Sequence, residues 1–272
     1  LWPEAPIQMG ALRNPIAQRV ARASERAVYR SARHVVALSP GMRDGVVAAG
    51  VDPDRVTVVP NACDLDLFSP NLDPGDLREQ LGLEGKFVCS YFGTMGEAND
   101  LTQVVEAAAL LCERGETGVA FVLQGEGKRR GAIESEVRRR KLSNVVLLPG
   151  AAKASAARLA AASDACMTIF KDVPILATNS PNKLFDTFAA GRAAIVNTDG
   201  WQRELVEGNE AGLYARAGDP AHLAQQVLWL RDHPEQTASY GRNARRLAEA
   251  RFDRRIVAER MRGLLEEAAS WP

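Results

Sequence analysis

Hydrophobic residues from Lys86 onward fall into short runs that alternate with helical stretches. The apolar runs occupy residues 87–92, 119–123, 145–148, 166–170 and 193–197. Helical patterns lie between them, at residues 100–114, 128–141, 154–163 and 181–190. Continuous apolar runs separated by amphipathic helices are typical of strands buried on both faces of a parallel sheet. The pattern therefore predicts an α/β fold with a doubly wound, Rossmann-like parallel sheet.

The rest of the chain is patterned differently. Before this region we predict a helix, a strand, a capped short helix and a second strand, at residues 15–32, 34–38, 39–50 and 56–60. Residues 73–84 are expected to be linker and short helix, and residues 220–269 are expected to be helical with interruptions at HP and GRNARR. The patterns divide the chain into three predicted parts: residues 1–70, residues 71–255 and a C-terminal helix at residues 256–272.

Composition limits the classes of function. The 272 residues are 46% hydrophobic and 25% charged, and 34 basic residues balance 34 acidic ones, so no net field favours nucleic acid as a partner. No apolar run approaches the roughly 20 residues that cross a bilayer, and no secretory signal is visible, so a cytoplasmic location is expected. The chain starts with Leu1 rather than Met, and LWPEAPIQMG suggests a fragment of a longer protein.

Metal chemistry has little support in the sequence. The four cysteines share no CxxC spacing and are expected to be buried free thiols. They are Cys63, Cys89, Cys112 and Cys166. Asp64-Leu65-Asp66 resembles the D-x-D that holds a divalent metal in some transferases, but turn and capping roles are favoured because no third ligand is visible. We expect neither a metal nor a cofactor.

The clearest functional motif is SPNKLFDTFAAG, which begins at Ser180. Ser180 is predicted to be the N-cap of a helix, Pro181 its first residue and Gly191 the left-handed residue past its end. The first turn of a helix presents free N–H groups and the positive end of the dipole, which together favour an anion.

Two charged side chains on this helix predict a phosphorylated ligand. Lys183 would hold the phosphate, and Asp186, one turn further on, would accept hydroxyl groups of the attached sugar. A solvated surface lysine and a carboxylate that caps a loop are the alternative. The connection from Lys171 to Ser180 favours the ligand, because it leaves the carboxyl end of a predicted parallel strand, where ligands of α/β sheets bind.

Glycines follow two other predicted strands. Gly93 and Gly96 lie in GTMG, and Gly125 and Gly127 lie in GEG. Glycine lets backbone approach a ligand closely, but Arg130 stands where a dinucleotide fingerprint has its third glycine. A plain tight turn is therefore the favoured interpretation of Gly125-x-Gly127.

Arginines form a stripe on the predicted helix at residues 15–32. They are Arg19, Arg22, Arg26, Arg30 and Arg33, and the other side carries Ile16, Val20, Ala27 and Val28. A helix that lies on anionic lipid and a domain helix with its apolar side in the core share this pattern, so both interpretations stay open.

Seven segments resemble glycosyltransferase family 4, a family of retaining enzymes with the GT-B fold. They are VVALSPGMRDGV, VVPNACDLDLF, YFGTMGEANDL, GEGKRR, NVVLLPG, SPNKLFDTFAAGRAAIV and the tail GRNARRLAE. The similarity covers nearly the whole chain. WPE, GTMG followed by ND, and SPNK most resemble the branch that transfers N-acetylated deoxy-sugars such as fucosamine during cell-surface polysaccharide assembly. The resemblance implies that residues 71–255 bind a nucleotide sugar without a metal, and that residues 1–70 end the acceptor domain.

The chain departs from the family pattern at three places. The E-x7-E motif falls on Thr178 and Asp186, so Asp186 would bind the ribose while Thr178, Asn179 or backbone would bind the transferred sugar. The basic pair after the first strand falls on Thr94 and Asp100, which leaves the diphosphate to Lys183, its helix N-terminus and Arg130. The family's catalytic histidine has no counterpart.

The resemblance thus implies a donor site with Lys183 and Asp186 as its catalytic residues. The full set of expected donor-binding positions is Gly93, Thr94, Gly96, Arg130, Gly150, Thr178, Asn179, Ser180, Pro181, Asn182, Lys183 and Asp186. A UDP-sugar donor and a saccharide or polyprenyl-linked acceptor are the implied partners, with contact at the inner face of the plasma membrane. The alternatives are a UDP-sugar epimerase, a non-catalytic nucleotide-sugar-binding module and, last, a dinucleotide-linked oxidoreductase.

Overall fold

The alternating pattern after Lys86 forms a six-stranded parallel sheet in the computed structural model, which describes residues 2–270. Its strands are β3 (Phe87–Phe92), β4 (Val119–Gln124), β5 (Val145–Leu148), β6 (Ala165–Thr168), β7 (Ala193–Val196) and β8 (Gly212–Tyr214). They lie in the order β5-β4-β3-β6-β7-β8. The predicted doubly wound sheet is confirmed. Strand β8 and the helix before it, α9 (Trp201–Glu207), were not predicted, because three residues are too few to show a period.

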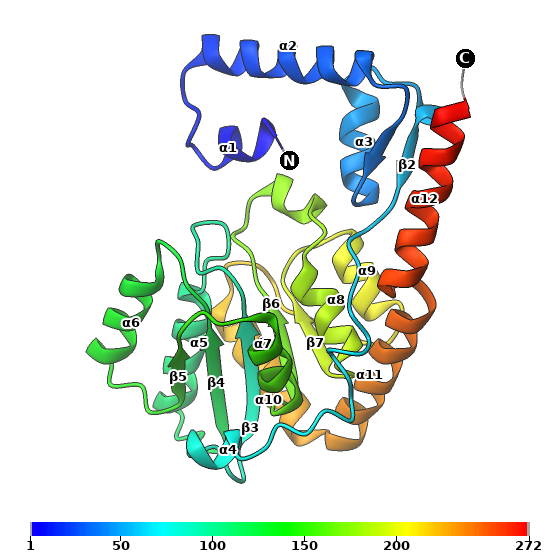
Figure 1. Ribbon diagram of the computed structural model, residues 1–272. Helices are drawn as coiled ribbons and strands as arrows, with labels where there is room; N and C mark the ends of the chain where they lie inside the picture. The colour runs from blue at the N-terminus through cyan, green and yellow to red at the C-terminus, as the bar shows by residue number, and fades with distance from the viewer. Residues whose placement is uncertain (1, 271–272) are drawn as a thin grey trace.

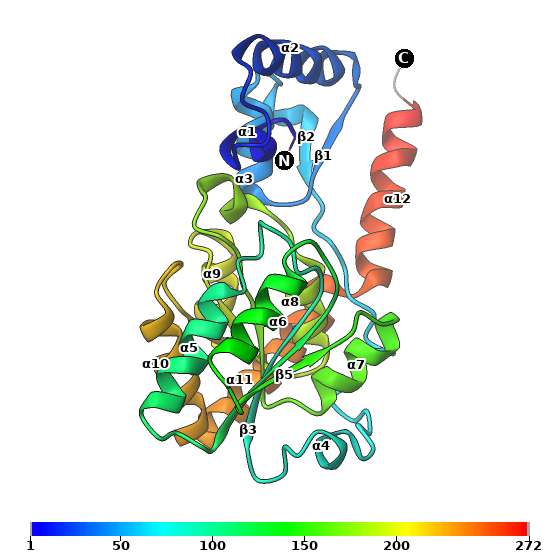
Figure 2. The ribbon, with the colours of Figure 1, turned by 90° about the vertical axis from the view of Figure 1, so that its left-hand side faces the viewer.

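Helices cover both faces of this sheet, as Figures 1 and 2 show from two sides. One face carries α5 (Thr102–Glu113), α6 (Arg130–Arg139) and α10 (Pro220–Asp232), and the other carries α7 (Lys153–Ala161), α8 (Asn182–Ala189) and α11 (Pro234–Leu247). A hydrophobic core lies on each face of the sheet, and the side chains of β3 point to the two faces in alternation. Cys89 and Tyr91 pack into the core on the first face, and Val88 and Phe92 pack into the core on the second. Burial on both faces explains the continuous apolar runs.

A smaller unit stands above this sheet in Figure 1. It contains α1 (Glu4–Gln8), α2 (Pro15–Ser31), β1 (Val35–Ala37), α3 (Pro40–Ala48), a 3₁₀ turn η1 (Pro53–Arg55) and β2 (Val56–Val58). β1 and β2 pair in parallel, with Val35 opposite Val56. Asn14 caps α2 by accepting from the N–H groups of Ile16 and Ala17, and Ser39 caps α3 by accepting from that of Met42.

Helix α2 turns apolar side chains to solvent rather than into the core. Ile16, Val20 and Val28 are 69%, 60% and 64% exposed. The interpretation that buries this side is wrong for these three residues, because the small core beside α2 is built from β1, α3 and β2 instead. Arg33 lies past the end of the helix, and Arg22 pairs with Glu4, so the predicted stripe is shorter than five arginines.

Two chain segments join the small unit to the large one (Figures 1 and 2). The first leaves β2, includes α4 (Leu77–Gln80) and enters β3, and the second is α12 (Arg254–Ser270), which follows a π-helical turn η3 (Ala248–Phe252). The segments meet where the N–H of Cys63 donates to the carbonyl of Phe252 at 2.8 Å and that of Arg254 donates to the carbonyl of Cys63 at 3.0 Å. GRNARR does not interrupt the helices, because it lies inside α11.

None of the helices within residues 2–270 combines the length and the hydrophobicity that a membrane crossing requires.

The topology of the sheet indicates where a ligand would bind. Connections run from β3 to β4 and β5 on one side and from β6 to β7 and β8 on the other, so the winding reverses between β3 and β6. Loops diverge at such a reversal and leave a crevice at the carboxyl ends of the strands.

Candidate functional site

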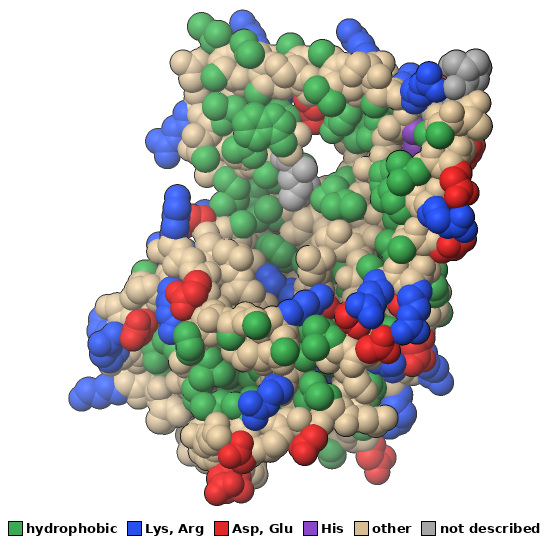
Figure 3. Space-filling model, in the orientation of Figure 1, with side chains coloured by type: hydrophobic (Ala, Val, Ile, Leu, Met, Phe, Trp, Pro, Cys, Tyr) green, Lys and Arg blue, Asp and Glu red, His purple; other side chains and the backbone are tan. Residues whose placement is uncertain are grey.

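A cavity of about 850 Å³ lies at this reversal, between the two units of the molecule. Figure 3 shows the surface hollowed there. The large unit lines it with residues from the ends of β3, β4 and β6, from the start of α7 and from α8, and the small unit lines it with Leu38, Met42 and Asn61. Nine of the expected donor-binding residues line this cavity: Gly93, Thr94, Gly150, Asn179, Ser180, Pro181, Asn182, Lys183 and Asp186.

The start of α8 differs from the prediction by one residue. Pro181, with φ −80° and ψ 123°, takes the N-cap position and the helix begins at Asn182, so Ser180 as N-cap and Pro181 as first helical residue are both wrong. Asn61 accounts for the difference: its backbone N–H donates to Ser180 Oγ at 3.2 Å and its amide donates to the carbonyl of Ser180 at 2.6 Å. Ser180 therefore ties the two units together. Gly191 has φ +63° and ends the helix as predicted.

Lys183 extends from the first turn of α8 toward the end of β3. Its Nζ donates to Tyr91 Oη at 3.1 Å and lies 4.6 Å from the ring centroid of Tyr91 and 5.1 Å from that of Phe170. The Asn99 amide lies 3.1 Å from the same ammonium, and its oxygen accepts when turned to that side. No carboxylate within residues 2–270 forms an ion pair with Lys183. Removal from water lowers the pKa of Lys183 to about 8.

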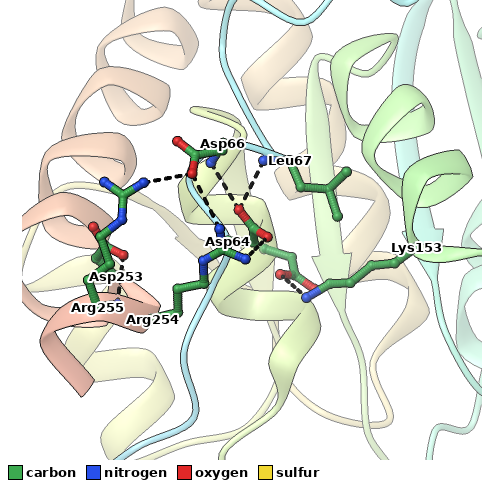
Figure 4. Close-up of polar contacts among 8 residues, drawn as sticks. Asp64, Asp66, Leu67, Lys153, Asp253, Arg254 and Arg255 are labelled. Carbon is green, nitrogen blue, oxygen red and sulfur yellow. Dashed lines mark hydrogen bonds and ion pairs between the residues drawn. The ribbon is translucent and has the colours of Figure 1, made fainter. Parts of the chain in front are cut away.

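Asp186 is a buried carboxylate one turn deeper in the same helix, 5% exposed. Lys153, from the start of α7, places its Nζ 3.1 Å from Asp186 Oδ1, a contact drawn as the dashed line at Lys153 in Figure 4. Burial raises the pKa of Asp186 to about 6, and the positive charge of Lys153 opposes that rise. The cavity thus presents an ammonium without a carboxylate partner and a carboxylate that is ionised at neutral pH. A phosphate joined to a sugar has groups that match both.

Glycines bring the first two loops of the sheet into direct contact. Gly93 has φ +142°, and a Cβ there would lie 2.9 Å from Lys183 Cε. A Cβ on Gly125 would lie 1.8 Å from the carbonyl oxygen of Gly93, and one on Gly127 would lie 2.4 Å from that of Met95. Gly125 and Gly127 therefore allow the loop after β4 to pack directly on the loop after β3, a role that the favoured interpretation as a plain tight turn did not include.

Three expected donor-binding residues lie outside the lining of the cavity: Gly96, Arg130 and Thr178. Arg130 donates to the carbonyls of Gly125 and Leu148 at 2.6 and 2.7 Å, so it holds the ends of β4 and β5 together. Thr178 lines a second cavity of about 520 Å³, between the small unit and the 3₁₀ turn Pro174–Thr178 of the large unit. Its carbonyl accepts from Ser39 Oγ, and its own hydroxyl donates to the carbonyl of Ile175 at 2.8 Å.

The D-x-D segment forms a turn and ion pairs (Figure 4). Asp64 Oδ1 accepts from the N–H groups of Asp66 and Leu67, both at 3.1 Å, which is an Asx turn. Asp64 and Asp66 also pair with arginines at the start of α12, Asp66 with Arg255 at 2.7 Å. The predicted turn role is confirmed. All four cysteines are free thiols, with Cys112 half-buried and the other three buried.

Sequence reasoning missed several residues that shape the site. Tyr91 and Asn99 hold Lys183 in place, Asn61 holds Ser180, and Lys153 holds Asp186. Tyr91 occupies a strand position that looks like core, and Lys153 begins an unremarkable alanine-rich helix. Of these residues only Tyr91 could have been suspected from the sequence. It lies near the end of β3, which was expected to meet a ligand, and side chains of a strand point to its two faces in alternation.

Comparisons with known proteins place the chain among glycosyltransferases. It is 35% identical over 81 residues to the UDP-Gal:alpha-D-GlcNAc-diphosphoundecaprenol alpha-1,3-galactosyltransferase of Escherichia coli. These 81 residues cover 29% of this chain and 21% of that protein. It is 31% identical over 106 residues to the putative glycosyltransferase EpsF of Bacillus subtilis (strain 168). These 106 residues cover 38% of this chain and 27% of EpsF. The matched region thus spans about a fifth to a quarter of the length of these relatives.

Solved structures confirm the fold. HepE of Anabaena in complex with UDP superposes with a TM-score of 0.79 at 22% identity, over 94% of this chain and 69% of that one. Sucrose-phosphate synthase from Thermosynechococcus elongatus gives a TM-score of 0.79 at 21% identity, over 97% and 66%. At this identity the likeness shows the fold, which is the expected GT-B type.

Two family models match the sequence. The Glycosyl transferase 4-like domain matches residues 2–62, within the small unit and its exit. The model described as Glycosyl transferases group 1 matches residues 86–233, more than half of the chain and nearly all of the six-stranded sheet with its helices. This chain therefore belongs to the Glycosyl transferases group 1 family.

Proposed function

We propose that the cavity binds a UDP-sugar and that the protein transfers its sugar, with retention, to a saccharide or polyprenyl-linked acceptor. Lys183 would bind the diphosphate, Asp186 the ribose, and the segment from Asn179 to Asn182 the sugar. The observation that carries this proposal is the half-buried ammonium of Lys183, which has no carboxylate partner within residues 2–270 and stands at the winding reversal of the sheet.

The charges of the site match the chemistry of the reaction. Bond breaking leaves negative charge on the diphosphate, and a cation already held in place stabilises that charge without further reorganisation. The rings of Tyr91 and Phe170 and the hydroxyl of Tyr91 fix the position of Lys183 before a ligand arrives. A partly desolvated ammonium interacts more strongly with phosphate than an exposed one does.

Similar proteins support the nature of the substrates. Solved HepE structures contain UDP, UDP with glucose, and UDP-glucose. The Escherichia coli relative carries a name that states a UDP-galactose donor and a diphosphoundecaprenol acceptor. We extend these properties to this chain, and with them a role in cell-surface polysaccharide assembly at the cytoplasmic face of the membrane. Transfer of an N-acetylated deoxy-sugar such as fucosamine is the narrower form of the proposal.

Calorimetry with UDP, UDP-glucose and ADP tests the donor site. We expect UDP and UDP-glucose to bind and Lys183→Ala to weaken both, while Lys171→Ala, an exposed lysine outside the cavity lining, leaves them unchanged. If neither UDP nor ADP binds at millimolar concentration while circular dichroism shows a folded protein, the proposal is wrong.

A non-catalytic nucleotide-sugar-binding module is the second candidate. It is favoured by the lining of the cavity, to which the small unit contributes Leu38, Met42 and Asn61, none of which can exchange a proton with an acceptor. Binding without acceptor-dependent turnover separates this candidate from the first. An epimerase has less support, because Asp172, the acidic residue of the loop, is exposed and lies outside the lining of the cavity.

A further inference from the structure

Lys153 contacts Asp186 from a different helix, α7, whereas Asp186 belongs to α8. It belongs to the first turn of α7, and its ammonium also lies 5.4 Å from the ring centroid of Phe68. The side chain of Lys153 is 50% exposed and that of Asp186 is 6% exposed, so the pair joins a surface cation to a buried anion. Neither the resemblance nor the comparisons assign a role to Lys153.

The two oxygens of the Asp186 carboxylate have different surroundings. Oδ1 is fully buried, accepts no hydrogen bond within residues 2–270, and forms an ion pair with the ammonium of Lys153 at 3.1 Å. Within residues 2–270, Oδ2 accepts no hydrogen bond from the protein, although Asp186 lines the cavity. The ion pair therefore fixes the orientation of the carboxylate and leaves one oxygen for a ligand. A carboxylate that receives a hydroxyl hydrogen bond is a stronger acceptor when it is ionised.

The charges around Asp186 make its ionisation depend on Lys153. Burial raises its pKa to about 6, the charge of Asp64 in the segment after β2 adds to the rise, and Lys153 counteracts both. Cys63 also faces Asp186, but its thiol is neutral because burial raises its pKa to about 12. Lys183 lies one turn away on the same helix and points to the rings of Tyr91 and Phe170 instead. Within these surroundings, removal of Lys153 leaves the carboxylate with desolvation and a like charge.

We propose that Lys153 is a positioning residue of the donor site, which holds Oδ1 of Asp186 so that the ionised carboxylate presents Oδ2 to the ribose hydroxyl groups. The inference rests on the proposed function and adds a residue to it. Lys153, which also lines the cavity, acts on the ribose through Asp186. Loss of the pair shifts the pKa of Asp186 upward, so the ribose contact is lost at a higher pH than in the wild type.

Uridine is the probe, because it carries the ribose without phosphate and so does not engage Lys183. We expect wild-type affinity for uridine to fall as the pH drops through about 6, where Asp186 gains its proton. For a shift of one pKa unit, Lys153→Met binds uridine about threefold more weakly near pH 6.5 and recovers at higher pH. Lys153→Arg keeps the wild-type profile, and Asp186→Asn removes the pH dependence. Lys141→Met, at an exposed lysine two residues past the end of α6, is the matched control.

Two results overturn the inference: a Lys153→Met profile that coincides with the wild type, or one lowered by the same factor at every pH, which indicates a structural role only. A wild-type protein that binds no nucleotide contradicts the proposed function instead. In that case ¹³C NMR titration of the Asp186 carboxyl in the ligand-free protein tests Lys153 separately. A higher midpoint in Lys153→Met than in the wild type supports the ion-pair role, and equal midpoints reject it.

Discussion

Lys183 combines a fixed position with incomplete neutralisation. An ammonium that is held by a hydroxyl and two aromatic rings, but by no carboxylate within residues 2–270, keeps most of its charge available for a ligand. Lys183→Ala should therefore weaken UDP by about 1.5 to 3 kcal/mol, the range for a charge-assisted hydrogen bond, and leave uridine nearly unchanged. Calorimetry with both ligands measures the difference. Equal losses for the two would point to a folding defect rather than to a lost phosphate contact.

The two titrating groups of the site should limit donor binding on both sides of neutral pH. The pKa of Lys183 is lowered to about 8, so the ammonium loses its proton as the pH rises through that value. The pKa of Asp186 is raised to about 6, so its charge is lost as the pH falls through that value. We expect the affinity for UDP-glucose to be highest between these two pKa values. Above the pKa of Lys183 the affinity should fall by up to about tenfold for each pH unit.

Variants assign the two limbs of this profile. UDP-glucose is suitable because its diphosphate diester keeps its charge across this range. The alkaline limb should disappear in Lys183→Ala and the acid limb in Asp186→Asn. An alkaline limb that persists in Lys183→Ala would assign it to another group.

At this scale the sequence predicted what is local and missed what is distant. Lys183 and Asp186 share a helix face, so their proximity follows from a spacing of three. Tyr91 lies 92 positions from Lys183 and meets it only because β3 and α8 pack at the same strand ends. The one-residue error at Ser180 has the same origin, since Asn61, 119 positions away, takes the hydrogen bonds of the expected cap.

The loops after β3 and β4 behave as one element because their backbones touch. A Cβ on Gly125 would lie 1.8 Å from a backbone oxygen that cannot rotate away, and φ at Gly125 is +159°. Gly125→Ala should lower the free energy of unfolding by more than about 2 kcal/mol. Gly131→Ala, in α6 with no atom within 4 Å of the new Cβ, should be neutral or stabilising by about 0.5 to 1 kcal/mol. Urea denaturation compares the two, and a neutral Gly125→Ala would contradict the contact.

Helix α2 presents both charges and apolar side chains to solvent. Ile16, Val20 and Val28 are exposed, and Arg19, Arg26 and Arg30 are exposed on the same helix. We expect α2 to bind anionic vesicles at low salt and to release them at high salt, because partly screened arginines supply much of the attraction. Cosedimentation measures binding.

Matched arginine variants identify the surface that binds. Arg19→Ser with Arg26→Ser should reduce sedimentation, whereas Arg138→Ser on α6, another exposed arginine, should not. Absence of cosedimentation at low salt would remove the membrane hypothesis.

Elements were predicted well where their patterns are long. The five apolar runs after Lys86 all became strands, because helices that the pattern also shows pack on both faces of the sheet, although the edge strand β5 is only partly buried. Strand β8 was missed because Gly212 and two further residues carry no period. The course of α2 could not be predicted, since its pattern fits a core-facing and a solvent-facing helix equally well.

At the scale of the molecule, the two units contribute unequally to the cavity. The large unit supplies every charged group that lines it, and the small unit supplies two apolar side chains and an amide. We therefore expect this chain alone to bind donor but to transfer sugar slowly, because the small-unit residues that line the cavity within residues 2–270, Leu38, Met42 and Asn61, cannot deprotonate an acceptor. UDP release from a panel of UDP-sugars, with and without undecaprenyl-linked acceptors, tests this. Rapid acceptor-dependent release that Lys183→Ala abolishes would show that residues 1–70 complete the site.

The meeting point of the two connecting segments has a mechanical consequence. Both segments cross between the units, and backbone hydrogen bonds between Cys63, Phe252 and Arg254 join them at one place. Two independent crossings far apart would resist any rotation of one unit against the other. Crossings that are fastened together act as a single pivot, about which the units can turn without stretching either segment. Such a turn changes the width of the cavity and strains the contacts that link the units beside it, those of Asn61 with Ser180 and of Ser39 with Thr178.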